Sequence, residues 1–487
     1  MKFMKHYQMY INGQFKDSES GKEITVINPA TGEKISTVPS ATKEEAQFAV
    51  DVAYKAQKDW KKIPAPARGQ YLHDLATKIR EDKDTLVHLL QEEQGKIKSL
   101  AETEILFSAD YFDYMAAQSR TYEGEILQSD NPNESIMISK QPIGVAAGIL
   151  PWNFPFFLIA RKMAPALVTG NTIVLKPSSD TPNIALEFAK LVDQVGLPAG
   201  VVSFITGPGS QVGNELSHND KVGIISLTGS FEAGKGVMEG AATHMAKVSL
   251  ELGGKAPAIV CSDADIDSAV QAIVDSRVDN NGQLCNNVER VYVQESVADE
   301  FEEKLAQKMS EVTVGDPLKD KEIGMGPLIN QAALDKVDQM VKNAVSAGGK
   351  ILTGGHRIEI ENGFYYEPTV ITNVEQKSEI VQKEIFGPVL PVLRFKTLDE
   401  AIEMSNDSEF GLTSSIYTKN LNNAYRASTE LEFGETYINR FNFEAMNGYH
   451  SGWKNSGVGG DDGRHGLEEF LNMHVVYLQG HPEDSQG

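Results

Sequence analysis

The sequence predicts an α/β protein with two lobes, the first built on a doubly wound parallel sheet covered by helices. Three observations support this fold class. Helical patterns dominate the first third of the chain, short apolar runs alternate with helical patterns from about residue 150, and a second alternation covers residues 256–439. Crossover segments between parallel strands are usually helices, so such alternation is typical of a sheet buried between helices.

The N-terminal third is expected to be helical because its apolar residues recur at helical spacing. Between residues 43 and 63, charged residues separate the members of an apolar stripe. That stripe contains Ala46, Ala49, Val50, Ala53, Ala56 and Trp60. The stretches "RGQYLHDLATKIRED" and "LAETEILFSADYFDYMAAQ" follow the same pattern, whereas strand-like runs flank a Pro-Gly break in residues 135–152.

The first alternation contains the predicted strands "NTIVLKP", "GVVSFITG", "VGIISLTG" and "KVSLELGG", with helical segments between them. The second runs from "APAIVC" to "GETYIN", so we expect the two lobes to join near residue 251. The run "NMHVVYLQG" at residues 472–480 is a further strand without an obvious partner nearby. Such edge strands often pair with another subunit.

Composition excludes several classes of protein. The chain has 487 residues and a formal net charge of −23, so its surface repels phosphate backbones and anionic membranes. No apolar run approaches the roughly 18–20 residues that cross a bilayer, and "MKFMKHYQMYINGQF" lacks the apolar core of a signal peptide. Two cysteines 24 positions apart fit a reduced compartment. We therefore expect a cytoplasmic protein that binds neither nucleic acid nor membranes.

The two cysteines lie in different surroundings. Cys261 ends the apolar run "APAIVC" and is expected in the core, whereas Cys285 lies among Gly, Gln and Asn in "NNGQLCNN". A catalytic thiol needs an environment that stabilises the thiolate and a base nearby. Glu251 follows an apolar strand and precedes two glycines, which we expect to keep space around its carboxylate. Inert burial of Cys285 and surface exposure of Glu251 are the simpler explanations when each residue is taken alone.

Three segments indicate a nucleotide site. The glycines of "GPGSQVG" at residues 207–213 are one residue too widely spaced for the dinucleotide fingerprint, and a simple turn is the simpler explanation for them. Gly229 and Gly234 follow a strand and open a helix whose N–H groups can hold a pyrophosphate. Lys176 lies at the carboxyl end of a strand, where such sheets bind ligands, although a solvated lysine is the simpler explanation.

Taken together, the motifs are far more specific than any one of them. The segments "PWNFP", "KPSS", "TGSFEAG", "LELGGKAP", "GQLCNN", "EIFGPV" and "SGVGG" occur in this order. This set resembles the NAD(P)-dependent aldehyde dehydrogenase superfamily. The similarity extends from "YINGQF" and "VINPATGE" to the terminal strand, and therefore covers essentially the whole chain.

The resemblance implies a fold of three parts. Residues 1–122 and 143–250 would form the cofactor-binding domain, residues 251–463 the catalytic domain, and residues 123–142 and 464–487 a small β arm for oligomerisation. Members of the superfamily form dimers and tetramers through such an arm, so we expect a homotetramer or a homodimer.

The resemblance also implies the chemistry. Cys285 would attack the aldehyde carbon, and the resulting thiohemiacetal would give hydride to the nicotinamide and leave an acyl-thioester. Glu251 would activate the water that hydrolyses it, so the product is a free acid. The amide of Asn153 and the backbone N–H of Cys285 would form the oxyanion hole. No metal ion is expected.

The cofactor residues follow from the same motifs. Lys176 would bind the adenosine ribose, Gly229 and Gly234 would lie beneath the pyrophosphate, and Glu384 would hold the nicotinamide ribose beside Phe386. The other expected contacts are Trp152, Ser179, Gly209 and Ser230. Members that prefer NAD usually carry a glutamate in place of Ser179. Its absence removes the repulsion against a 2′-phosphate, so NAD or NADP is expected as cofactor.

Three residues indicate the substrate. Arg161 lies eight residues after Asn153, on roughly the same face of the expected helix, and an arginine there calls for a polar or anionic partner. Arg161, Glu444 and His450 resemble the lactaldehyde and glycolaldehyde branch of the family, in which such residues bind the substrate hydroxyl. Phe441 departs from the polar residue usual in that branch, and a structural role is an open alternative for each of the three.

Three other functions remain open from the sequence. Arg161 could bind a carboxylate or phosphate, as in NADP-preferring succinate-semialdehyde or non-phosphorylating glyceraldehyde-3-phosphate dehydrogenases. Cys285 could act as a cysteine hydrolase with a histidine, although the sequence places none reliably beside it. A non-enzymatic binding protein on the same scaffold would not need Cys285, Glu251 and Asn153 together.

Overall fold

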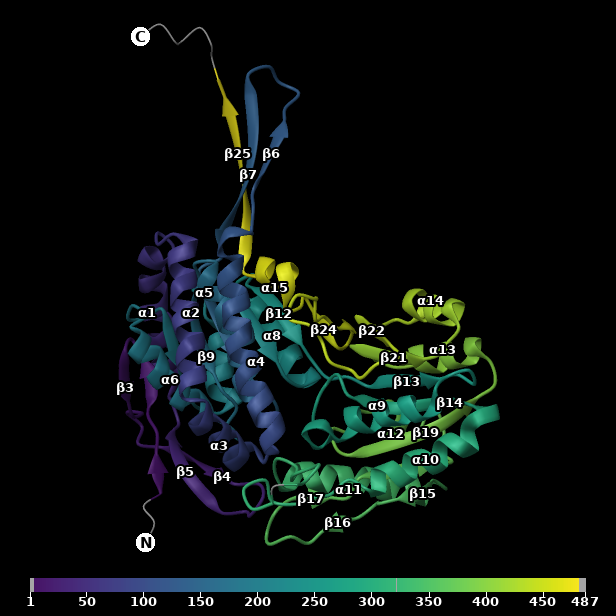
Figure 1. The fold of residues 1–487 in the computed structure, drawn as a ribbon. Coiled ribbons are helices and arrows are strands. Elements are labelled where there is room, and N and C mark those ends of the chain that lie inside the picture. The colour runs from purple at the N-terminus through teal and green to yellow at the C-terminus, as the bar shows by residue number, and fades with distance from the viewer. Residues whose placement is uncertain (1–3, 321, 481–487) are drawn as a thin grey trace, which may run out of the picture.

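The computed structural model describes residues 4–320 and 322–480, and it confirms the expected α/β fold. Figure 1 shows two α/β lobes side by side, with a narrow β arm that projects from the first. Residues 1–3 and 481–487 of the expected domains lie outside the described residues. The domain boundaries stay a prediction. Within the described part of the chain, no helix is long and apolar enough to cross a membrane.

The first sheet has eight strands in the order β24-β12-β11-β8-β9-β10-β2-β3. Its five central strands are parallel: β8 (Val145–Ile149), β9 (Thr172–Lys176), β10 (Val202–Phe204), β11 (Val222–Thr228) and β12 (Lys247–Glu251). Antiparallel edges are added by β2 (Met9–Ile11), β3 (Gln14–Lys16) and β24 (Gly457–Val458). The chain fills the sheet on one side of β8 with β9 and β10, then on the other with β11 and β12. The carboxyl ends of β8 and β11 therefore mark the switch point, where such sheets bind ligands.

Helices cover both faces of this sheet (Figure 1). They are α1 (Lys43–Trp60), α2 (Ala65–Glu81), α3 (Lys83–Gln94), α4 (Lys98–Ala117), α5 (Pro155–Val168), α6 (Asn183–Val195), α7 (Asn214–His218) and α8 (Phe231–Ala242). The helix predicted over residues 43–63 is confirmed as far as Trp60, and Thr42 and Glu45 form a reciprocal capping box at its start. Its apolar stripe is buried except for Ala56, which is half-buried. Helix α5 begins at Pro155, a residue preorganised for a first helical turn.

The second sheet has the order β15-β18-β19-β14-β13-β21-β22, and all its neighbours except β15 and β18 are parallel. Its strands are β13 (Ala256–Val260), β14 (Val288–Gln294), β15 (Lys350–Thr353), β18 (Thr369–Thr372), β19 (Val389–Phe395), β21 (Thr413–Tyr417) and β22 (Glu435–Ile438). The helices of this lobe include α9 (Ile266–Val278), α10 (Ala298–Ser310), α11 (Gln331–Ser346), α13 (Leu398–Asn406) and α14 (Leu421–Glu430). Cys261 is buried directly after β13, as expected.

The arm consists of β6 (Glu125–Gln128), β7 (Glu134–Pro142) and β25 (Leu471–Gln479). Strand β25 pairs along its whole length with β7, so the terminal strand has its partner within the same chain. This corrects the expectation that it lacks a nearby partner: the partner is distant in sequence but adjacent in space. Several apolar side chains on the arm are exposed, among them Ile126 at 79% and Tyr477 at 66%.

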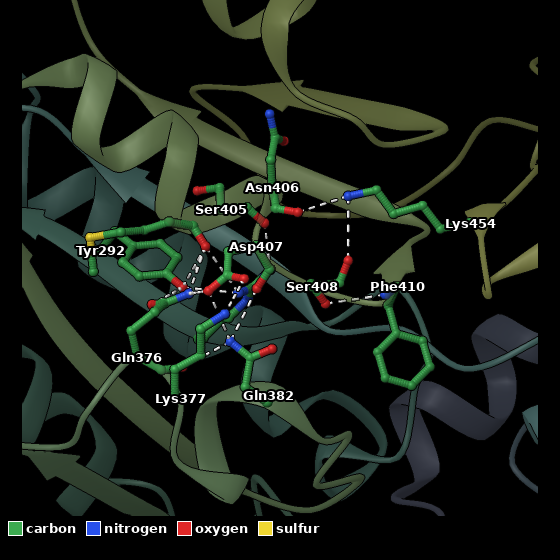
Figure 2. Close-up of polar contacts among 12 residues, drawn as sticks. Tyr292, Gln376, Lys377, Gln382, Ser405, Asn406, Asp407, Ser408, Phe410 and Lys454 are labelled. Atoms are coloured by element: carbon green, nitrogen blue, oxygen red, sulfur yellow. Dashed lines mark hydrogen bonds and ion pairs between the residues drawn. The ribbon is translucent and has the colours of Figure 1, made fainter.

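A short segment near the chain end joins the two lobes. Strand β23 (Trp453–Lys454) pairs with β20 (Phe410–Gly411), and β24 then pairs with β12, which ends in Glu251. Figure 2 shows the polar cluster around the loop that precedes β20, in which Asp407 pairs with Lys377 at 2.5 Å and accepts a hydrogen bond from the Gln376 amide at 3.1 Å. Nζ of Lys454 donates to the carbonyl of Asn406 at 2.8 Å. These contacts thus stabilise the loop that precedes β20, the strand with which β23 pairs.

One buried carboxylate ties four parts of the second lobe together. Glu289 on β14 accepts hydrogen bonds from Lys255 Nζ at 2.9 Å and from the backbone N–H groups of Ile385 and Phe386 at 2.8 and 2.9 Å. It also lies 3.0 Å from Nη1 of Arg277. Burial alone would raise the pKa of Glu289, but Lys255 and Arg277 outweigh it and hold the pKa below its usual value.

We expect Glu289→Gln to destabilise the protein, because two buried cations lose their common counter-ion. Breaking a buried ion pair from one side costs about 3–5 kcal/mol. The loss is measured as a lower denaturant midpoint. Glu430→Gln is the matched control, since Glu430 pairs with Arg426 on an exposed helix face and its loss should leave stability nearly unchanged. Equal effects of the two substitutions would contradict the role assigned to Glu289.

Candidate active site

Cys285 lies in a cavity between the two lobes, in the loop that leads from the end of α9 into β14. The cavity has a volume of about 60 Å³. A space of this size suits a molecule of a few heavy atoms. It is lined by Phe107, Asn153, Phe154, Phe157, Leu158, Arg161, Thr228, Glu251, Asp279, Leu284, Cys285, Asn286, Asn442, Phe443, Glu444 and His450.

A second cavity of about 240 Å³ adjoins the first at the carboxyl ends of β8 and β11. Asn153, Thr228 and Cys285 line both, so the thiol lies where the two cavities meet. Five of the expected cofactor residues line the second cavity: Trp152, Gly229, Ser230, Glu384 and Phe386. The Trp152 and Phe386 rings meet edge to face at 5.4 Å.

The loop that carries Cys285 depends on its asparagines. Asn280 and Asn281 have φ angles of 46° and 61°, a left-handed conformation that asparagine tolerates better than most residues. The Asn280 amide donates to the backbone carbonyl of Asn153 at 2.9 Å. Burial raises the pKa of the Cys285 thiol, and the neighbouring His450 opposes that shift.

Asn153 lies just before the start of α5. Its amide donates to the carbonyl of Gln283 at 2.9 Å, which directs the side chain toward the cysteine loop. Glu104 supports this end of α5 by accepting the N–H groups of Phe156 and Phe157 at 2.8 and 3.1 Å. Lys96 pairs with Glu104 and donates to the Asn153 carbonyl at 2.9 Å.

Glu251 ends β12 with its side chain 2% exposed. Neither carboxylate oxygen accepts a hydrogen bond from a described residue, although Nε2 of His450 lies 3.4 Å from one of them. Burial raises the pKa of Glu251 to about 8, against an opposing effect of His450. A buried carboxylate with free lone pairs and a pKa near neutrality has the properties of a general base.

The glycines after Glu251 have a different use from the one expected. A side chain at Gly253 would lie 3.0 Å from the Glu384 carboxylate, and one at Gly254 would collide with the carbonyl of Cys285. Glu384 accepts the N–H of Gly254 at 2.8 Å, and burial raises the pKa of Glu384 to about 7. The lack of side chains at Gly253 and Gly254 therefore allows the Glu384 and Cys285 loops to approach closely. It does not serve to keep space around Glu251.

The remaining expected cofactor residues lie outside the linings of these two cavities. Lys176 is buried at the end of β9, where Nζ donates to the carbonyl of Pro177 at 3.0 Å, and burial lowers its pKa to about 8. Ser179 follows in the next loop, and Gly209 begins a short helical turn at residues 209–213. Gly234 packs against Leu252: a side chain at this position would lie 2.5 Å from Cδ2 of Leu252, which would have to move.

The expected substrate residues share one wall of the first cavity. Nη2 of Arg161 donates to Glu444 at 2.9 Å, while the ring of Phe157 packs against the guanidinium. His450 lies close to Glu251, and its Nδ1 is 2.6 Å from Glu435. Burial would lower the pKa of His450, but Glu251 and Glu435 outweigh it and raise the pKa well above its usual value. His450 thus lines the same cavity as Cys285, as its predicted role at the substrate requires.

Residues 15–476 match the aldehyde dehydrogenase family. The chain belongs to this family. It is 54% identical to the lactaldehyde dehydrogenase of Escherichia coli (strain K12) over 97% of this chain and 98% of that one. A crystal structure of lactaldehyde dehydrogenase from Escherichia coli superposes with a TM-score of 0.97 and covers 98% of this chain and 100% of that one. A structure of 3,6-anhydro-L-galactose dehydrogenase in complex with NAP has 43% identity and a TM-score of 0.95, and covers 97% and 100%.

As a member of the aldehyde dehydrogenase family, the chain is an oxidoreductase that acts on an aldehyde group with NAD or NADP. The second cavity suits such a cofactor, because it is a glycine-edged hollow beside a carboxylate and two aromatic rings. Within the described residues, no group of three or more His, Cys, Asp or Glu side chains is placed to hold a metal ion.

Sequence reasoning missed several residues of this dehydrogenase site. Asp462 pairs with Arg161, Glu435 pairs with His450, and Asn286 donates to Glu444 at 2.6 Å. The consecutive acids of "GGDDGR" were an available signal for Asp462, and the charged pair inside the apolar strand "VERVYVQ" was one for the supporting Glu289, because a charge in such a context must find a partner. Neither signal says which cation the carboxylate meets.

We expect Gly254→Ala to lower aldehyde oxidation, because the added methyl group displaces the backbone of Cys285. A displacement of about 1 Å in an active site can cost 100-fold in rate. The readout is kcat/KM from NAD(P)H absorbance, with circular dichroism to verify folding. Gly236→Ala in α8 is the control, since no atom lies within 4 Å of the new side chain. Full activity of Gly254→Ala would refute the close-approach argument.

Proposed function

We propose that this aldehyde dehydrogenase oxidises a small 2-hydroxyaldehyde, such as lactaldehyde or glycolaldehyde, to the free carboxylic acid. The observation that carries the proposal is the placement of Arg161 in the small cavity that also contains Cys285 and Asn153. Nη1 of Arg161 has no hydrogen-bond partner among residues 4–320 and 322–480, which leaves a donor for a substrate hydroxyl. The similarity to the lactaldehyde dehydrogenase of Escherichia coli supports the same substrate class.

In the proposed reaction, Sγ of Cys285 attacks the aldehyde carbon and forms a thiohemiacetal. The Asn153 amide and the Cys285 backbone N–H stabilise the oxyanion. Bound NAD or NADP supplies the acceptor for the hydride that leaves the carbon. Glu251 then takes a proton from water, which attacks the thioester, releases the acid and restores the thiol.

The hydroxyl end of the substrate would bind at the Arg161 wall, the wall of the first cavity that Arg161, Glu444 and His450 share. Arg161 would donate a hydrogen bond to the hydroxyl oxygen, and Glu444 can accept a hydrogen bond from the hydroxyl group. His450 would donate a further hydrogen bond or hold its charge near the reacting thiol. The aromatic side chains of Phe107, Phe157 and Phe443 close the cavity and exclude water, which strengthens these polar interactions.

We further propose that the cofactor site accepts both NAD and NADP, because Ser179 places no carboxylate against a 2′-phosphate. The exposed apolar side chains on β6 and β25 support assembly into a homodimer or homotetramer through the arm. The net charge of −23 and the two free cysteines support a cytoplasmic location.

The substrate proposal is tested with an aldehyde panel read by NAD(P)H absorbance and run with both cofactors. We expect lactaldehyde to be oxidised with a higher kcat/KM than propanal, which lacks only the hydroxyl. Arg161→Leu should raise KM for lactaldehyde by about 10- to 100-fold, the range of a lost hydrogen bond from a charged group, and affect propanal far less. Equal losses on both aldehydes would exclude a hydroxyl-binding arginine.

A pH profile tests the role of Glu251. Its pKa is raised to about 8, so the carboxylate form that acts as base is the minor form at pH 7. We expect hydrolysis of the thioester to accelerate as pH rises through about 8, and the acyl-enzyme to accumulate below it. Single-turnover measurements separate this step from hydride transfer. Glu251→Gln should keep the hydride burst and abolish both steady-state turnover and its pH dependence; unchanged turnover would disprove the assignment.

A further inference from the structure

Asp462 contacts Arg161 and has an unusual backbone conformation. Its φ of 72° and ψ of 162° fall in a region of backbone conformation that is almost restricted to glycine. The surrounding turn is pinned by hydrogen bonds from Gly463 N to the Met446 carbonyl at 3.0 Å and from His450 N to the Asp461 carbonyl at 3.0 Å. The fold therefore imposes this conformation on an aspartate, and its side chain is 1% exposed.

The Asp462 carboxylate binds Arg161 in a bidentate manner. Nε of Arg161 donates to Oδ1 at 3.0 Å, and Nη2 donates to Oδ2 at 2.6 Å. Nη2 also donates to Glu444 at 2.9 Å, so two carboxylates face one guanidinium. The Arg161 and Glu444 side chains are 5% and 16% exposed, which leaves little water to screen these charges.

We propose that Asp462 is a specificity-determining residue that positions Arg161 and compensates its charge, so that the site accepts neutral aldehydes and rejects those bearing a carboxylate or phosphate. The inference deepens the proposed function and rests on it for the location of the substrate. Asp462 acts through Arg161 and needs no contact with the substrate.

The charge balance supports this assignment. Arg161 and His450 contribute two positive charges, whereas Asp462, Glu444 and Glu435, which pairs with His450, contribute three negative ones. An anionic substrate would therefore add a further negative charge within a desolvated wall that already has an excess of carboxylates. Repulsion between close like charges is strong at the low effective dielectric of such a site. A hydroxyl meets no such repulsion, because it uses only the remaining Nη1 donor and one carboxylate acceptor. An arginine that binds an anionic substrate would instead lack carboxylate partners, so that its positive charge would be available to the substrate.

The test compares succinate semialdehyde with 4-oxobutanamide, which has nearly the same shape and no charge. We expect Asp462→Asn to raise the ratio of kcat/KM for the acid over the amide by about tenfold or more, the scale of like-charge effects across a buried contact. Asparagine keeps the size of aspartate and tolerates a positive φ. A gain on the anionic substrate cannot result from structural damage, which would lower both values.

Two further variants complete the experiment. Glu444→Gln removes the other carboxylate from Arg161 and should shift the ratio in the same direction, which covers the case in which Asp462→Asn fails to fold. Asp461→Asn is the matched control, because Asp461 lies 3.5 Å from Lys162 rather than against Arg161, and its ratio should stay near that of the wild type.

An unchanged ratio in Asp462→Asn and Glu444→Gln, or a wild-type enzyme that already prefers succinate semialdehyde to the amide, would overturn the proposal. Neither test substrate is a 2-hydroxyaldehyde. A failure of the proposed function, seen as equal wild-type rates on lactaldehyde and propanal, is therefore distinguishable from a failure of this inference.

Discussion

The buried carboxylate of Glu289 is the constraint on which both cavities depend. It binds Lys255 after β12, Arg277 on α9 and the N–H groups of Ile385 and Phe386. Arg277 in turn donates to the carbonyls of Val288, at 2.9 Å, and Gly282, which flank the loop of Cys285. The ionised Glu289 side chain thus positions the loop of Cys285 through Arg277. It positions the loop of Glu384 through the N–H groups of Ile385 and Phe386. Its charge is stable in the core because two cations and two backbone donors replace water.

The second requirement is the contact between lobes. Glu251 at the end of β12 and Asn153 before α5 belong to the first lobe, whereas Cys285 and Glu384 lie in loops of the second lobe. Strand β24 pairs with β12 of the first sheet, and β23 pairs with β20, which directly precedes β21 of the second sheet. A segment of six residues therefore links the two lobes beside the site. Neighbouring parts of this segment also carry His450 and Asp462. The part of the chain that links the lobes beside Glu251 and Cys285 therefore also positions the polar side chains of the substrate wall.

Electrostatics divides the site into two functional regions. Near the thiol, Glu251 is buried without hydrogen bonds to described residues, and its pKa of about 8 suits proton transfer. Beside Arg161, the charges of His450 and Arg161 hold the pKa of Glu444 at about 2 despite its burial, so that this carboxylate remains ionised. The same side-chain chemistry serves as a base in one place and as a fixed charge in the other. The difference lies in which cations each carboxylate contacts.

The sequence by itself determined the local features of this protein. Apolar periodicity indicated the helix at residues 43–63 and both sets of alternating strands and helices, because these patterns depend on residues close in the chain. Motif order identified Cys285, Glu251 and Asn153 as candidates and the family to which the chain belongs. Only the tertiary structure decided that β25 pairs with β7, that Glu289 supports two loops and that Asp462 neutralises Arg161. Each of these contacts joins segments far apart in sequence, and a residue's type does not say which distant partner will satisfy its hydrogen bonds or its charge.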